Sequence, residues 1–184
     1  MKFISTPFQT AFFTLWISVS ITLPVFAGPQ KSKPAPVLNM RDIAGKQVNS
    51  KTLLSKGPVL VWFWNSCCGI KKPQVESLKK LYEKYKKKGF QIVAISEDGV
   101  NKTGKTKKAV SVYKMPFIIV MDKSRNLMGK FQAFAVPSVY LISRDNKIVF
   151  THSGYMPGDE KKLEKAIVPL FPSIEAESKT EGDS

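Results

Sequence analysis

The chain's only two cysteines, Cys67 and Cys68, are neighbours, and they stand two residues after an apolar stretch that ends in Val61-Trp-Phe-Trp64. Thiolates attack disulfides and bind soft metal ions, so this pair is the first candidate for chemistry. A bridge between neighbours would close an eight-membered ring with a distorted peptide, and it would be poor at joining distant segments. We therefore expect a chemical rather than a structural role for the pair.

The elements around the cysteines predict how they are held. Residues 58–64 are uniformly apolar, as in a strand covered on both faces, and the stretch after Pro73 has apolar side chains at helical spacing. The amino end of that helix, together with Lys71, would favour a thiolate at Cys68. Pro73 would oppose this effect if it moved the start of the helix further along the chain. We favour a reactive Cys68 over a buried, inert thiol, and we expect Cys67 to be packed rather than catalytic.

The rest of the chain continues this alternation of strands and helices. We predict a hairpin, a helical turn, three strand–helix units, a second hairpin and a last helix. The expected elements cover residues 37–48, 49–54, 58–64, 73–88, 90–96, 102–114, 117–121, 125–133, 139–151 and 159–170. Strands separated by helices pair in parallel, and a hairpin adds antiparallel strands. The predicted fold class is α/β, with a mixed central sheet flanked by helices on both faces and an N-terminal hairpin extension.

Both ends of the chain differ in composition from this middle part. Residues 1–27 have a basic start, an apolar stretch and small residues before a cleavage site after Ala27, which is typical of a signal peptide. The alternative is a retained N-terminal membrane anchor. Residues 28–36 read as a linker, residues 37–171 as one folded domain, and residues 172–184 as a disordered acidic tail. We expect a periplasmic or secreted protein, where free thiols must be kept reduced by a dedicated system.

Charge is strongly unbalanced, with 29 lysines and arginines against 14 acidic residues and a formal net charge of +15. Between Gly28 and Phe171 the counts are 27 and 10, a formal +17. Such a field could draw the protein toward an anionic membrane surface. We favour a solvated lysine surface with only weak membrane contact. Nucleic acid is not an expected partner, because its readers rely on arginine and interleaved aromatic residues.

The order and spacing of these elements resemble the thioredoxin-like superfamily. More closely, they resemble the TlpA/ResA-like extracytoplasmic thiol-disulfide oxidoreductases, which have a redoxin (AhpC/TSA-like) domain. The resemblance spans residues 37–170 and rests on Phe63-Trp64 before the thiols, on LYEKYKKKGFQIVAIS after them, and on AFAVPSVYLISRDNKIVF near the end. It implies a thioredoxin fold and thiol-disulfide exchange, with no cofactor and no metal.

The active-site pattern of that family is only partly present. Matched position by position, Cys68 falls on the family's nucleophilic cysteine, and Lys71 stands where the resolving cysteine belongs. Two acids that transfer protons in relatives are replaced by Trp62 and Gln74. The resemblance thus implies a degenerate site in which Lys71 is a candidate to stabilise the Cys68 thiolate but cannot release a mixed disulfide. Cys67 is a candidate vicinal partner, although it cannot take the resolving geometry without bending the chain.

The same resemblance implies where a substrate binds. Val136-Pro137 matches the family's cis-proline, which puts a backbone edge beside the nucleophile for an extended peptide. The candidate substrate-binding residues are therefore Trp64, Val136 and Pro137. The expected partners are protein thiols or disulfides, or an extended segment of a partner protein.

Three functions remain open at this point. The first is thiol-disulfide exchange with Cys68 as the single nucleophile and an external thiol that resolves the mixed disulfide. The second is a redox-inactive thioredoxin-like module that binds a partner protein. The third, which we favour least, is copper handling by the two cysteines, for which the lone His152 and Met156 are weak candidates as further ligands.

Overall fold

The computed structural model describes residues 33–68 and 70–171. The predicted signal peptide and acidic tail lie outside the described residues, as do residues 28–32 of the predicted linker. The end of that linker packs against the domain, since Ala35 is 5% exposed and its N–H donates to the Asn146 carbonyl at 2.9 Å. Lys33 contacts the hairpin that contains Asn146, since its carbonyl accepts from the Ile148 N–H at 2.9 Å, and the domain bounds of 37–171 stay a prediction. Within the described ranges, no helix is long and apolar enough to cross a membrane.

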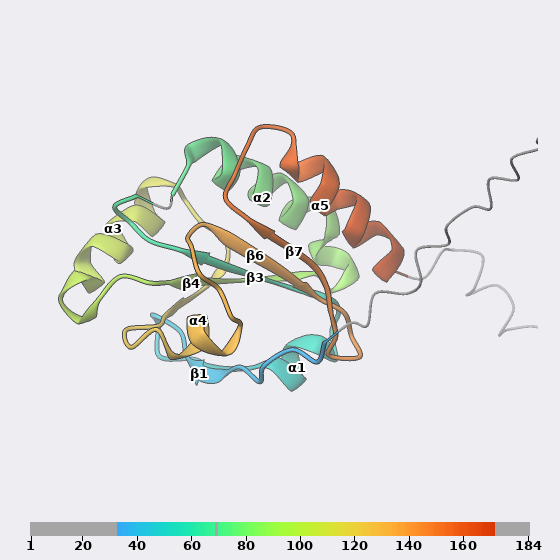
Figure 1. Cartoon of the computed structure of the whole chain (residues 1–184), viewed down its shortest axis with the longest axis horizontal. Helices are drawn as coiled ribbons and strands as arrows, with labels where there is room; N and C mark the ends of the chain where they lie inside the picture. Colours follow the sequence, from blue (N-terminus) through green and yellow to red (C-terminus); the bar gives the residue numbers. More distant parts are fainter. Residues whose placement is uncertain (1–32, 69, 172–184) are drawn as a thin grey trace, which may run out of the picture. The chain divides into compact units, whose positions relative to one another are not determined.

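Five strands form the central sheet, in the order β5-β4-β3-β6-β7 (Figure 1). They are β3 (Val59–Trp64), β4 (Gln91–Ser96), β5 (Ile118–Met121), β6 (Ser138–Ile142) and β7 (Ile148–Ser153). The first three are parallel, β6 is antiparallel to β3, and β7 is antiparallel to β6. Every residue of β3 is buried, as expected for a central strand covered on both faces. The predicted mixed sheet is confirmed.

Helices lie on both faces of this sheet (Figure 1). One face carries α2 (Lys72–Tyr85), α3 (Thr103–Val112) and α5 (Asp159–Ile167), with the short 3₁₀ turns η1 (Lys86–Lys88), η2 (Val100–Lys102) and η3 (Val168–Leu170) at their ends. The other face carries α1 (Ser50–Leu54), α4 (Asn126–Lys130) and the hairpin of β1 (Asn39–Arg41) and β2 (Gln47–Asn49). The elements follow the predicted order.

The alternation of side chains along β3 creates two cores. Leu60, Trp62 and Trp64 pack on the α2 side, whereas Val59, Val61 and Phe63 pack on the α1 side. All six have 1% exposure or less, so β3 is the most completely buried strand of the described chain. It ends in a fixed position from which the next residues leave the sheet.

One edge of the sheet gathers the ends of several strands. In register, Trp64 at the end of β3 pairs with Ser96 at the end of β4, and Phe63 pairs with Ser138 at the start of β6. The residues after β3 therefore leave the sheet beside Pro137, which immediately precedes β6. The Val136–Pro137 peptide bond is cis, as the family resemblance implied.

Candidate active site

Cys67 and Cys68 lie in the loop between β3 and α2, and both side chains are exposed. The Cys68 Sγ–H donates to the Cys67 Sγ at 2.9 Å, and the two cysteines are not bonded to each other in this structure. The chain bends through residues 66–68, where the two sulfurs meet. The sequence indicated that Cys67 needs a bend in the chain to reach a resolving geometry. Cys68 is thus not a buried thiol, and Cys67 is not packed as predicted.

The environment of Cys68 favours its protonated form. The hydrogen bond to Cys67 and the repulsion between the two sulfurs raise the pKa of Cys68 above its ordinary value of 9.0, desolvation adds to this, and Lys102 opposes it. The predicted help from a helix start is absent, because α2 begins only at Lys72, with Pro73 in its first turn. Lys102 supplies a positive charge that lowers the pKa of Cys68, whereas the predicted stabilising role of Lys71 stays a prediction.

A buried carboxylate, Asp98, holds the start of the cysteine loop. Its oxygens accept hydrogen bonds from the Ser66 N–H at 3.2 Å and from the Ser66 hydroxyl at 2.9 Å. The hydroxyls of Ser96 and Thr106 donate to it at 2.9 and 2.7 Å. Burial raises the pKa of Asp98, but the hydrogen bonds from Thr106, Ser66 and Ser96 outweigh it, and the pKa lies below its ordinary value. Asp98 therefore ties the loop to β4 and α3, beside which the loop runs in Figure 1.

A side-chain hydrogen bond also holds the backbone at Cys68. Asn65 Oδ1 accepts from the Cys68 N–H at 3.0 Å, which closes a turn over the cysteine pair. This N–H is therefore not free to stabilise a thiolate on Cys68. The loop is fixed at Ser66 by Asp98 and at Cys68 by Asn65, with Cys67 between the two fixed points.

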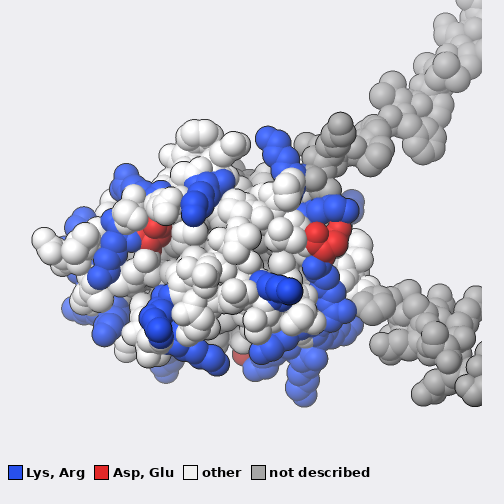
Figure 2. All heavy atoms as spheres, turned by 90° about the horizontal axis from the view of Figure 1, so that it is seen from below, with Lys and Arg blue, Asp and Glu red and all other residues white. Residues whose placement is uncertain are grey.

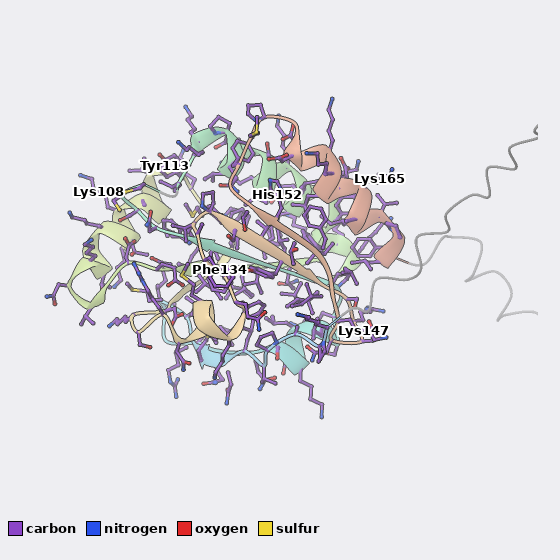
Figure 3. The ribbon with its side chains drawn as sticks, viewed as in Figure 1. Lys108, Tyr113, Phe134, Lys147, His152 and Lys165 are labelled. Atoms are coloured by element: carbon purple, nitrogen blue, oxygen red, sulfur yellow. The ribbon has the colours of Figure 1, made fainter. Side chains whose placement is uncertain are left out.

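The predicted substrate-binding residues do not all reach the surface. Trp64 has no exposed surface and stacks on Trp62 with ring centroids 5.6 Å apart, so it packs under the cysteine loop and cannot touch a substrate in this conformation. Val136 is half-buried and precedes the cis bond. The exposed group near it is Phe134, with 93% of its side chain exposed; Figure 3 places it near α4.

The residues considered for copper are not gathered around the cysteines. His152 Nε2 pairs with Asp159 Oδ2 at 2.8 Å, in a small pocket between β7, α2 and α5 that Gln74 also lines (Figure 3). Met156 is 71% exposed. In the part of the chain that the structure describes, no group of three or more His, Cys, Asp or Glu side chains is placed to hold a metal.

Comparisons with known proteins agree with this arrangement. Residues 32–151, well over half of the chain, match the AhpC/TSA family. The chain belongs to the AhpC/TSA family.

Proteins that are similar to this chain have names that state a thiol-disulfide activity. The thiol-disulfide oxidoreductase ResA of Bacillus thuringiensis (strain Al Hakam) is 32% identical over 120 residues, which cover 65% of this chain and 68% of that protein. ResA of Bacillus subtilis (strain 168) is 28% identical over 139 residues, covering 72% and 74%. The crystal structure of the thiol:disulfide interchange protein DsbE from Chlorobium tepidum matches with a TM-score of 0.70 at 28% identity, covering 77% of this chain and 97% of that one.

Sequence reasoning missed three residues of this AhpC/TSA domain: Asp98, Lys102 and Phe134. The first two follow β4, and loops after parallel neighbouring strands meet at one edge of the sheet, so their position after a predicted strand was a usable signal. Phe134 stands three residues before the cis-proline, but nothing in the sequence marks it as exposed. Its neighbour Ala133 is buried.

Proposed function

We propose that this chain carries out thiol-disulfide exchange outside the cytoplasm, with Cys68 as the attacking sulfur. The observation that carries the proposal is an exposed cysteine pair at the same sheet edge as a cis Val136–Pro137 bond. Homology to ResA, whose name states this activity, supports it. The signal-peptide pattern in residues 1–27 supports a periplasmic or secreted location.

The proposed chemistry begins with the Cys68 thiolate. It attacks one sulfur of a substrate disulfide, forms a mixed disulfide, and releases the other substrate sulfur as a thiolate. The half-buried Val136, which precedes the cis bond, is the residue whose backbone we propose as the edge for an extended substrate segment, because Pro137 is buried and its carbonyl accepts from the Gly154 N–H at 2.7 Å. Residue 71 is a lysine, which cannot resolve the mixed disulfide, so the exchange is atypical for the family. Because the pKa of Cys68 is raised, this first step becomes faster as the pH increases.

The partner that fits this site best is an extended segment of another protein. Phe134, with 93% of its side chain exposed, offers an apolar contact on the loop that leads into the cis bond. The same exposure favours a second candidate function, a redox-inactive module that binds a partner protein at this edge.

Figure 2 shows another property of the surface. On the face seen from below, the charged side chains are mostly Lys and Arg, which favours weak contact with anionic membranes.

Turnover of a protein disulfide tests the first function. Reduced insulin chains precipitate, so insulin in the presence of dithiothreitol reports catalysed reduction. We expect the wild type to accelerate precipitation and the Cys68→Ser variant to lose the acceleration. Equal acceleration by both proteins would contradict the role of Cys68. A different result would favour the binding module. In that case neither protein accelerates precipitation, both bind an extended peptide equally well, and Phe134→Ser abolishes the binding.

A further inference from the structure

We infer that Cys67 is the resolving thiol of this site: it attacks the mixed disulfide on Cys68 and closes a disulfide between the two neighbouring residues. The inference rests on the proposed function, in which Cys68 takes part in exchange. It gives the chain an internal second step that its lysine at position 71 does not provide.

The contact between the two sulfurs carries the inference. They are 2.9 Å apart, and the Cys68 thiol is the donor to Cys67. The chain has two cysteines in all, so Cys67 is the only internal thiol that could attack a mixed disulfide on Cys68. Both side chains are exposed, which leaves room for a substrate sulfur on Cys68 and for the departure of that sulfur.

The loop around the pair allows the backbone to adjust. Seven residues separate the end of β3 at Trp64 from the start of α2 at Lys72, and both cysteines lie in the first part of this interval. Neither cysteine belongs to a helix, so a rotation of the peptide between them costs the hydrogen bond from the Cys68 N–H to Asn65 Oδ1 but breaks no helical hydrogen bond. Upstream, Asp98 keeps Ser66 in place.

The second step balances without an additional group. The Cys67 thiol loses its proton to solvent, its thiolate attacks Cys68 Sγ, the bond between Cys68 and the substrate sulfur breaks, and the substrate leaves as a thiolate. The two steps together move two electrons from the cysteine pair to the substrate disulfide. A dithiol donor, either a small molecule or a reduced protein, returns the two electrons by the same exchange chemistry.

The ring formed in this step is strained. Neighbouring Cα atoms lie about 3.8 Å apart across a trans peptide, which is shorter than the ~4.4–6.8 Å usual in disulfides. A strained disulfide is more easily reduced than an unstrained one. The oxidised form of this chain is therefore a strong oxidant that returns readily to the dithiol, and the reduced pair is the resting state.

Stoichiometric oxidation tests the inference. The reduced protein is mixed with one equivalent of dipyridyl disulfide, whose pyridinethione product does not reverse the reaction. The released thione is measured by absorbance and the protein is weighed intact. We expect the wild type to release both thiones of the reagent and to become lighter by two hydrogens. The Cys67→Ser variant should release one thione and keep one pyridylthio group on Cys68.

The outcomes separate the inference from the function on which it rests. A wild type that keeps the pyridylthio group, like Cys67→Ser, would overturn the resolving role of Cys67 and leave exchange at Cys68 intact. A Cys67→Ser variant that forms no adduct would instead remove the proposed function itself. The Cys67→Ser variant alters an exposed side chain, so it is expected to fold.

A spacing variant tests the strain. The double variant Cys67→Ser with Lys71→Cys moves the second thiol to the two-residue spacing of the family, next to the start of α2. Equilibrated with reduced and oxidised glutathione, the wild type should be at least tenfold further toward the dithiol than this double variant. Equal positions of the two equilibria would contradict a strained ring between neighbours.

Discussion

At the scale of single residues, the most informative group is Cys68, whose thiol is exposed but whose proton is held by its neighbour. Its pKa is raised by Cys67 through a hydrogen bond and through repulsion, and Lys102 offsets only part of this. A nucleophilic cysteine at a helix start usually has a lowered pKa. Here the later start of α2 removes that effect, and the adjacent sulfur adds the opposite one.

Replacing Cys67 should therefore make Cys68 more reactive toward alkylation. In Cys67→Ser the two largest causes of the raised pKa disappear, so the rise of the iodoacetamide reaction rate with pH should move to lower pH. The measurement is the rate of Cys68 modification by mass spectrometry across a pH series. An unchanged pH midpoint would show that the sulfur pair does not control the ionisation of Cys68.

The Asp98→Asn variant should loosen the cysteine loop. It removes a buried carboxylate that accepts hydrogen bonds from Ser66, Ser96 and Thr106, and each charge-assisted bond is worth about 1.5–3 kcal/mol. We expect a loss of about 1–3 kcal/mol in the free energy of unfolding, and a slower reaction of Cys68 with disulfides. The exposed Glu83→Gln is the acid-to-amide control and should change the stability by less than about 0.5 kcal/mol.

Asp98 also has a pH signature. Its folded-state pKa is lowered, so the stability it contributes is present above its ordinary value of 3.8 and is lost as the pH falls through the folded value. Chemical denaturation between pH 5 and about 2 should therefore show a smaller acid-induced loss in Asp98→Asn than in the wild type. Identical losses in the two proteins would contradict the network.

At the scale of elements, the sequence predicted most of what positions the site. The apolar residues 58–64 indicated a doubly covered strand, and the structure confirms β3 as fully buried. Helical spacing predicted α2 but not its first residue, because Pro73 is compatible with more than one position in a first turn. The first residue of α2 determines whether Cys68 lies at the helix start, and the sequence left that residue uncertain by a few positions. The electrostatics of the site therefore could not be predicted.

Tertiary contacts account for the other differences. Trp64 precedes the cysteine loop in the sequence, which made it a candidate for substrate contact, but its side chain points into the core with Trp62. Ala35 lies in a stretch rich in proline and lysine, yet it pairs with the β6–β7 hairpin, far along the chain. Neither contact has a local signal, because each depends on a partner that only the complete fold brings close.

Gly89 caps η1, the 3₁₀ turn that follows α2, and it tests how closely this turn approaches the segment around Lys56. Its φ is +90°, and a Cβ atom there would lie 1.9 Å from the Lys56 carbonyl oxygen. We expect Gly89→Ala to lose at least about 2 kcal/mol of unfolding free energy. The control is Gly104→Ala in α3, where no atom lies within 4 Å of the added Cβ; it should gain about 0.5–1 kcal/mol. Urea denaturation measures both, and equal effects would contradict the close approach.

At the scale of the whole molecule, a buried acid makes stability depend on pH. Glu97 is 5% exposed, and among the described residues neither of its carboxylate oxygens has a hydrogen-bond partner. Burial raises its pKa to about 8, with Asp122 and Asp98 adding to this and Arg125 opposing it. Its ordinary value is 4.5, so between these two pH values the folded protein holds a proton that the unfolded chain has lost.

The free energy of unfolding should consequently decrease as the pH rises from about 5 to about 9. The Glu97→Gln variant keeps the neutral form at every pH, so we expect it to lack this decrease and to exceed the wild type by at least about 1 kcal/mol at pH 9. Denaturation at a series of pH values measures this, with the exposed Glu83→Gln as control. Parallel curves for the wild type and Glu97→Gln would show that Glu97 ionises normally.

The central claim is that Cys68 attacks protein disulfides, and the most direct test is to trap the attack. Reduced Cys67→Ser is mixed with insulin, quenched with acid and weighed intact. The account predicts a covalent complex of the variant with one insulin chain, which dithiothreitol releases and which the variant lacking both cysteines never forms. If Cys67→Ser stays unmodified while a free peptide thiol under the same conditions reacts, Cys68 is not a nucleophile toward protein disulfides and the proposed function is wrong.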